Sequence, residues 1–130
     1  MILTIRTDKP EAEIGLFDNN KKVAYETWEA HRELSDTLLK KIDDMLQQHS
    51  MTPQKDLNGI VAFKGPGSFT GLRIGLTVGN ALAYAVDVPI VAVGGDDWIQ
   101  DGIARINNGD NDRIAMPEYG GEANITRPKK

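Results

Sequence analysis

The segment that decides the fold reads Gly65-Pro66-Gly67-Ser68-Phe69-Thr70-Gly71-Leu72-Arg73. It follows a short apolar run, residues 59–63, and precedes an apolar segment that is rich in Gly and Ala. The run predicts a buried strand, and the segment predicts a helix over residues 69–85. A strand, a glycine-rich turn and a helix can place backbone N–H groups around an anion. The same arrangement also lets a tight turn lead into a closely packed helix.

The turn matches neither of the two common phosphate-binding motifs. A Walker A loop ends in Gly-Lys-Ser or Gly-Lys-Thr, whereas Gly71 is followed by Leu72. The glycine spacing is one residue too long for a dinucleotide-binding fingerprint. Ser68 or Thr70 is expected to cap the helix, and Arg73 is either a surface cation or a partner for a phosphate or an acid.

Three glycines are spaced four residues apart along the predicted helix, at Gly71, Gly75 and Gly79. They form one bare stripe, although each Gly in a helix interior costs about 1 kcal/mol relative to Ala. Something therefore packs closely on the stripe. The pattern leaves open whether this is the chain's own sheet or the surface of a partner.

The other predicted elements complete an α/β fold with a mixed five-stranded sheet. Three strands over residues 2–5, 13–17 and 22–29 are joined by short turns and predict an antiparallel meander. An amphipathic helix over residues 35–49 follows, capped by Ser35 or by a residue just before it. The strands at 59–63 and 89–93 enclose the glycine helix, which predicts a parallel βαβ unit.

One domain is expected over residues 1–104, ending in a short helix at 96–104, with a polar linker and an extended tail over 105–130. The chain has 130 residues and a net charge of −4, which argues against a free-standing nucleic-acid binder. It has no Cys, and we expect neither a signal peptide nor a membrane span. A cytoplasmic protein is expected. Asp96, Asp97 and Asp101 are interpreted as helix-start acids, and no metal site is predicted.

The segment Lys64-Gly65-Pro66-Gly67-Ser68-Phe69-Thr70-Gly71-Leu72-Arg73-Ile74-Gly75 closely resembles the signature of the TsaB (YeaZ) family. Residues 88–93 are similar to that family's next strand, and residues 1–5 and 32–39 to its first strand and first helix. Residues 117–122 and 127–130 look like the end of such proteins. The resemblance covers residues 1 to about 97 and the tail.

The resemblance implies an actin-like, ribonuclease-H-like lobe and a non-catalytic role in making N6-threonylcarbamoyladenosine (t6A) in tRNA. TsaB proteins bind the catalytic relative TsaD, the pair recruits the ATPase TsaE, and tRNA is reached only through the complex. The contact with TsaD is made by the two helices of the first lobe. Here it would involve Ser35, Leu38, Leu39, Ile42, Gly71, Leu72, Gly75, Val78, Gly79 and Leu82.

Three departures from the family pattern argue against nucleotide chemistry on this chain. Arg6-Thr7-Asp8 stands where the family often has Asp-Thr-Ser, and Leu34-Ser35 stands where it has His-Ser. Most of the second lobe is missing, so a shortened member without a bound cofactor is expected. Two alternatives remain open: a nucleotide-binding or hydrolysing domain that uses residues 65–71, and a homodimer formed through the same helices.

Overall fold

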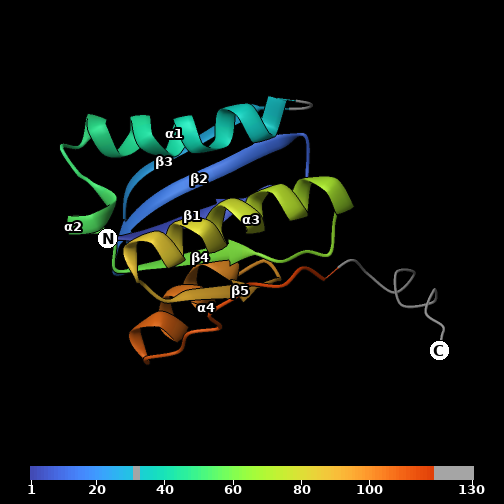
Figure 1. Cartoon of the computed structure of the whole chain (residues 1–130). Helices are drawn as coiled ribbons and strands as arrows, with labels where there is room; N and C mark the ends of the chain where they lie inside the picture. The colour runs from blue at the N-terminus through green and yellow to red at the C-terminus, as the bar shows by residue number, and fades with distance from the viewer. Residues whose placement is uncertain (31–32, 119–130) are drawn as a thin grey trace.

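The computed structural model describes residues 1–30 and 33–118, which form a five-stranded sheet with helices on both faces (Figure 1). The strand order is β3-β2-β1-β4-β5. The strands are β1 (Ile2–Arg6), β2 (Glu11–Asp18), β3 (Lys21–Glu29), β4 (Gly59–Phe63) and β5 (Ile90–Val93). The predicted mixed sheet is confirmed. Residues 119–130, the far part of the predicted tail, lie outside the described residues.

The first three strands form the predicted antiparallel meander. β2 and β3 are joined by a two-residue turn in which Asn19 adopts a positive φ of 54°, a conformation that Asn tolerates better than most residues. The register of the hairpin shifts at Leu16 and Phe17, where the ladder is irregular. The meander therefore has an irregular ladder close to its β2–β3 turn.

The parallel half of the sheet is built around β1. β1 pairs with β4 in parallel, with Ile5 beside Ala62, and β4 pairs with β5 in parallel, with Ala62 beside Ala92. The predicted strand–helix–strand unit is confirmed. Its strands are almost fully buried because helices cover both faces.

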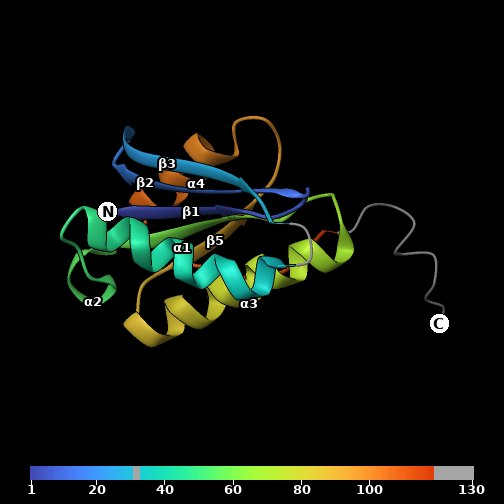
Figure 2. The ribbon, with the colours of Figure 1, turned by 90° about the horizontal axis from the view of Figure 1, so that it is seen from above.

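The described residues form four helices: α1 (Leu34–Gln48), α2 (Pro53–Asp56), α3 (Phe69–Val86) and α4 (Trp98–Asn107). α1 and α3 lie side by side on one face, and α4 covers the other (Figure 2). The first layer of the core includes Leu3, Ile5, Leu38 and Ile42, all buried. The second is centred on Phe63 and Trp98, whose rings pack edge to face with centroids 5.6 Å apart. No helix in the described chain is long and apolar enough to cross a bilayer.

Two predicted boundaries are sharpened or changed by the structure. Of the two caps left open for α1, Ser35 lies in the first turn, and a preceding residue, Glu33, occupies the cap position without a side-chain cap bond. The boundary predicted at residue 104 falls inside α4, which continues to Asn107. The described part of the predicted linker also bonds to the lobe, because Asp112 donates its backbone N–H to Ile90 and Glu118 donates its own to Lys64.

Candidate partner-binding face

The glycine-rich turn is packed against the residues that follow β1. Gly65 has a φ of +107°, and a Cβ there would collide with the carbonyl oxygen of Glu118. A Cβ at Gly67 would come within 2.5 Å of Cβ of Asp8. Ser68 caps α3 as predicted, because its Oγ accepts a hydrogen bond from the N–H of Gly71 at 3.5 Å. The turn's glycines are thus required by the chain's own packing.

The glycine stripe of α3 faces the chain's own sheet. A Cβ at Gly71 would meet the carbonyl oxygen of Thr7, and one at Gly75 would meet the Thr7 side chain. At Gly79 the nearest atom is Cδ1 of Ile90, 3.2 Å away. Thr7 Oγ1 also donates a hydrogen bond to the carbonyl of Gly71 at 2.7 Å. The alternative left open by the sequence is therefore decided in favour of packing within the chain.

This placement bears on the predicted interface. Five of the ten predicted interface residues are buried instead of facing solvent, namely Leu38, Ile42, Leu72, Gly75 and Gly79. Of these, Ile42 still borders an open hollow beside Leu39, although its side chain is only 2% exposed. Gly71 is partly exposed, but its bare side is filled by Thr7.

The remaining predicted residues lie along an open groove between α1 and α3. Ser35 and Leu39 are exposed on α1, and Val78 and Leu82 are half-buried on α3. The groove has two hollows that share Ser35. One, of about 670 Å³, lies beside Leu39, and the other, of about 350 Å³, is lined by Phe69, Thr70, Arg73, Ile74, Thr77 and Val78.

The groove has an apolar centre and a charged rim. Leu39 is 55% exposed and Phe69 54%, and each borders one of the two hollows. Exposed apolar side chains that gather beside a hollow are more informative than single exposed ones. Asp36, Lys40 and Asp43 line the α1 side, and the guanidinium of Arg73 lies 5.4 Å from the centre of the Phe69 ring. Apolar anchors surrounded by charges are typical of a protein-binding surface.

Arg6, the last residue of β1, forms an ion pair with Asp8, which follows the strand. Arg6 Nε donates to Asp8 Oδ1 at 2.8 Å, and the guanidinium lies 3.9 Å from the centre of the Phe63 ring. The hydrogen bond to Asp8 raises the pKa of Arg6, partial burial opposes this, and the charge of Asp8 adds to it. Asp8 is therefore engaged by a cation within the chain.

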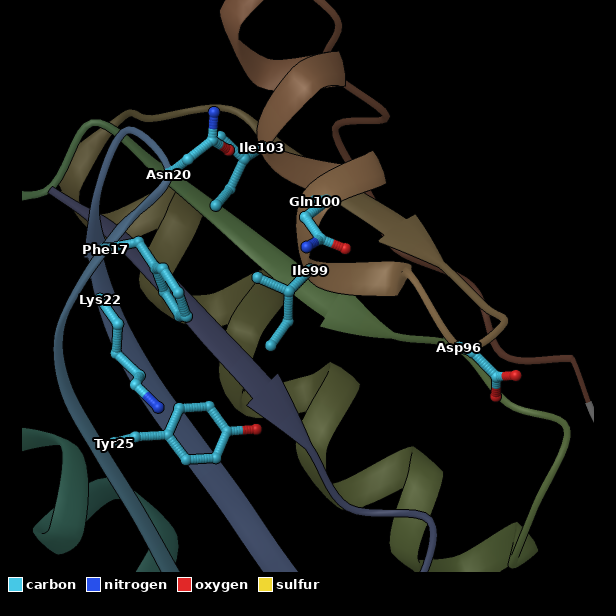
Figure 3. Close-up of a pocket in the computed structure, with 8 residues that line it drawn as sticks. All are labelled: Phe17, Asn20, Lys22, Tyr25, Asp96, Ile99, Gln100 and Ile103. Atoms are coloured by element: carbon cyan, nitrogen blue, oxygen red, sulfur yellow. The ribbon is translucent and has the colours of Figure 1, made fainter.

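A second cleft, of about 310 Å³, lies on the opposite face of the sheet, between α4 and the β2–β3 hairpin (Figure 3). Phe17 and Tyr25 form one wall and Ile99 the other. The sequence pattern does not distinguish these residues, because apolar positions on strands and helices also predict core. Burial and a hydrogen bond from its hydroxyl to Glu13 raise the pKa of Tyr25.

Known proteins are similar to this chain over part of the fold described above. A family model described as TsaD, tRNA N6-adenosine threonylcarbamoyltransferase, matches residues 28–97, more than half of the chain. A Bacillus subtilis protein named tRNA threonylcarbamoyladenosine biosynthesis protein TsaB is 37% identical over 92 residues. The chain belongs to the TsaB/YeaZ family.

Further TsaB/YeaZ relatives agree in sequence and in structure. The Escherichia coli protein of the same name is 37% identical over 62 residues, which is 48% of this chain and 26% of that protein. The solved structure of YeaZ from Pseudomonas aeruginosa superposes with a TM-score of 0.66 at 26% identity, covering 72% of this chain and 43% of YeaZ. The actin-like fold is thereby confirmed.

The alignments include only part of the length of each relative. The Bacillus subtilis alignment covers 71% of this chain but 40% of that TsaB protein. The alignment thus includes most of this chain but only about two fifths of the length of the Bacillus subtilis TsaB protein. A Bradyrhizobium protein named tRNA N6-adenosine threonylcarbamoyltransferase is also similar, 36% identical over 64 residues.

Proposed function

We propose that this chain is a non-catalytic subunit of the t6A machinery that binds a TsaD-type protein through the α1–α3 groove. The family of the chain supports the first half of this proposal, since its relatives are named for threonylcarbamoyladenosine biosynthesis. A TsaE-type ATPase would join the pair, and tRNA would be reached through the complex. The chain itself would carry no catalytic residue and would act in the cytoplasm.

The observation that carries the proposal is the exposure of Leu39 and Phe69 beside the groove. The sheet-facing sides of both helices are already buried, so these two side chains contribute little to the core. They border the two hollows that share Ser35, so a partner surface that fills both hollows would cover both side chains. Burying a Leu or a Phe side chain contributes about 1.5–3 kcal/mol, enough to anchor a complex.

The residues of the groove have different expected roles. Leu39 and Phe69 would be the anchors, Val78 and Leu82 would form the apolar floor between them, and Ser35 would lie where the two hollows meet. Arg73 would pair with an acidic group of the partner at the rim. The glycines of α3 would act only indirectly, by holding the helix close to the sheet.

The test is binding to the TsaD-type protein of the same organism, measured by calorimetry with the whole chain. Leu39→Asp places a carboxylate in the apolar contact and is expected to weaken binding at least about 30-fold. Tyr84→Asp is the matched control, because Tyr84 is 91% exposed on α3 and lines neither hollow. Equal affinity of both variants and the unmodified chain would overturn the proposed face.

The nucleotide-binding alternative has less support from the structure. The turn's glycines are filled by Glu118, Asp8 and Thr7, so their bare sides do not form an open cradle. Calorimetry with ATP or ADP and Mg²⁺ on the chain alone tests this alternative, and micromolar binding would favour it. A homodimer through the groove would show as a doubled mass that Leu39→Asp returns to that of a monomer.

A further inference from the structure

The outer edge of the sheet at β5 is hydrogen-bonded to three side chains and one backbone N–H instead of to another strand. Ile90 and Ala92 direct their backbone groups away from β4, and all four of these groups are hydrogen-bonded. The N–H of Ile90 donates to Asn111 Oδ1 at 3.1 Å, and that of Ala92 donates to Asp112 Oδ2 at 2.8 Å. The carbonyl of Ile90 accepts from the N–H of Asp112 at 2.8 Å, and that of Ala92 from Arg105 Nη1 at 3.3 Å.

We call Arg105, Asp110, Asn111 and Asp112 the edge clasp. Arg105 extends from α4, and its guanidinium holds both acids, with Nη2 2.6 Å from Asp112 Oδ1 and Nε 3.0 Å from Asp110 Oδ2. Partial burial raises the pKa of Asp112, but the bonds from Arg105 and from the Ala92 N–H outweigh it and lower the pKa below the ordinary value. A charged network therefore takes the place of a sixth strand.

The chain beyond the clasp is fastened at two more points. Ala115 is buried, and its N–H and carbonyl bond the side-chain amide of Asn80 on α3 at 2.7 and 3.1 Å. Glu118 then donates its backbone N–H to the carbonyl of Lys64 at 2.7 Å, at the start of the glycine-rich turn. Figure 1 shows this orange-to-red segment running from α4 along β5 toward that turn.

The two outer strands of the sheet are protected in different ways. β3 carries Lys21, Lys22 and Glu26 and has an irregular register with β2, both of which oppose pairing with another strand. β5 is Ile-Val-Ala-Val, with no charge, no Pro and no Gly. An open edge of that composition is a template for strand pairing. Among the described residues, the clasp takes up the outward-facing backbone groups of β5 and so prevents this.

We propose that the edge clasp is a lock on a self-association site: when it opens, β5 pairs with β5 of a second copy. Identical strands can pair about a two-fold axis, because the same edge serves both copies. The released N–H and C=O groups of Ile90 and Ala92 would bond across the axis, as they now bond the clasp. The interface is distinct from the α1–α3 groove, since it lies at an edge of the sheet and involves neither Leu39 nor Phe69.

The experiment compares Asp112→Ala with the control Asp101→Ala, which removes an exposed acid of α4 outside the clasp. Hydrogen exchange at single amides and mass in solution over a range of concentrations are measured on the whole chain. In Asp112→Ala the Ile90 and Ala92 amides are expected to exchange at least about tenfold faster at low concentration. The mass is expected to rise to that of a dimer as concentration increases, with Asp101→Ala unchanged in both respects.

A second substitution tests whether the new contact is the β5 edge. Ala92→Pro removes a donor that points away from β4, a place where an edge strand tolerates Pro. Added to Asp112→Ala, it is expected to return the mass to that of a monomer. Arg105→Gln provides the same test from the other side of the clasp if Asp112→Ala does not fold. Unchanged exchange, faster exchange without a dimer, or a dimer that Ala92→Pro leaves intact would each overturn the proposal.

Discussion

The two sides of α3 differ in what they contact: one packs tightly on the chain's own sheet, and the other lines an open groove. The side with Gly75 and Gly79 lies so close to the sheet that there is little or no room for a methyl group. The side with Val78 and Leu82 lines an open groove, with Phe69 exposed at its end. The edge clasp belongs with the first kind of surface, because the chain closes β5 with its own atoms. The groove is of the second kind, which is why we assign it to a partner.

The comparison corrects an attractive inference from the sequence. Glycines at four-residue spacing predict a close contact, either with the chain's own sheet or with a partner, and the family resemblance favours the partner. In the structure the same spacing lets α3 approach Thr7 and Ile90 of the chain itself. Small residues therefore indicate a close contact without saying with what, whereas large apolar residues exposed beside a hollow are the feature on which we base the proposed partner contact.

The largest effect is expected from neighbouring leucines on α1. Leu38 is fully buried and Leu39 is 55% exposed. Leu38→Ala leaves a cavity and should lower the free energy of unfolding by about 3 kcal/mol, while Leu39→Ala should change it by less than about 0.5 kcal/mol. Urea unfolding measures both. Similar losses at the two positions would show that the face assigned to the partner belongs to the core.

Gly75→Ala separates the two interpretations of the glycine stripe by the sign of its effect. On a free helix face, Ala would stabilise the protein by about 1 kcal/mol. Against Thr7, which is buried and hydrogen-bonded to Gly71, the added methyl group should destabilise it by about 2 kcal/mol. Thermal and urea unfolding give the sign, and a more stable variant would contradict the inward placement.

Ser68→Ala tests the start of the same helix. Loss of the bond from the N–H of Gly71 should lower the free energy of unfolding by about 1 kcal/mol. Thr70→Ala is the control, because Ser68 alone supplies the cap of α3. If both substitutions cost the same in urea unfolding, Ser68 has no special role at this turn.

The smallest effect concerns pH and the clasp. The pKa of Asp112 is lower in the folded chain than its ordinary value of 3.8, so folding favours the ionised form. The stability that Asp112 contributes is therefore fully present above 3.8 and is lost as the pH falls through the lower, folded value. The difference in unfolding free energy between the unmodified chain and Asp112→Asn should be constant from pH 7 to 5 and shrink below 3.8. A difference that does not change down to pH 2 would contradict the clasp.

Much of the fold follows from local patterns in the sequence. The strand at 59–63 and the start of α3 at Phe69 are found where the sequence predicts them, because Ser68 caps a long apolar segment. The antiparallel meander follows from short turns such as that at Asn19. These features depend on residues that are close in the chain, so the sequence alone specifies them.

Which face of each helix packs on the sheet could not be predicted in the same way. A period of 3.6 residues places Leu38 with Ile42 and Leu39 on another face, but both faces contain apolar residues. Which one meets the sheet depends on where α1 lies relative to α3 and β1, contacts between distant parts of the chain. The clasp was missed for the same reason: Arg105, Asp110 and Asp112 look like a polar linker until β5 is placed beside them.

The most direct test of the central claim uses the absence of cysteine in this chain. Leu39→Cys and Tyr84→Cys each introduce a single thiol on an exposed helix position, one beside the groove and one away from it. The rate of alkylation of this thiol is measured by mass spectrometry with and without a saturating TsaD-type partner. We expect the partner to slow alkylation at Leu39→Cys at least about tenfold and to leave Tyr84→Cys unchanged. Protection at Tyr84→Cys, with Leu39→Cys still freely alkylated in the complex, would contradict the proposed face.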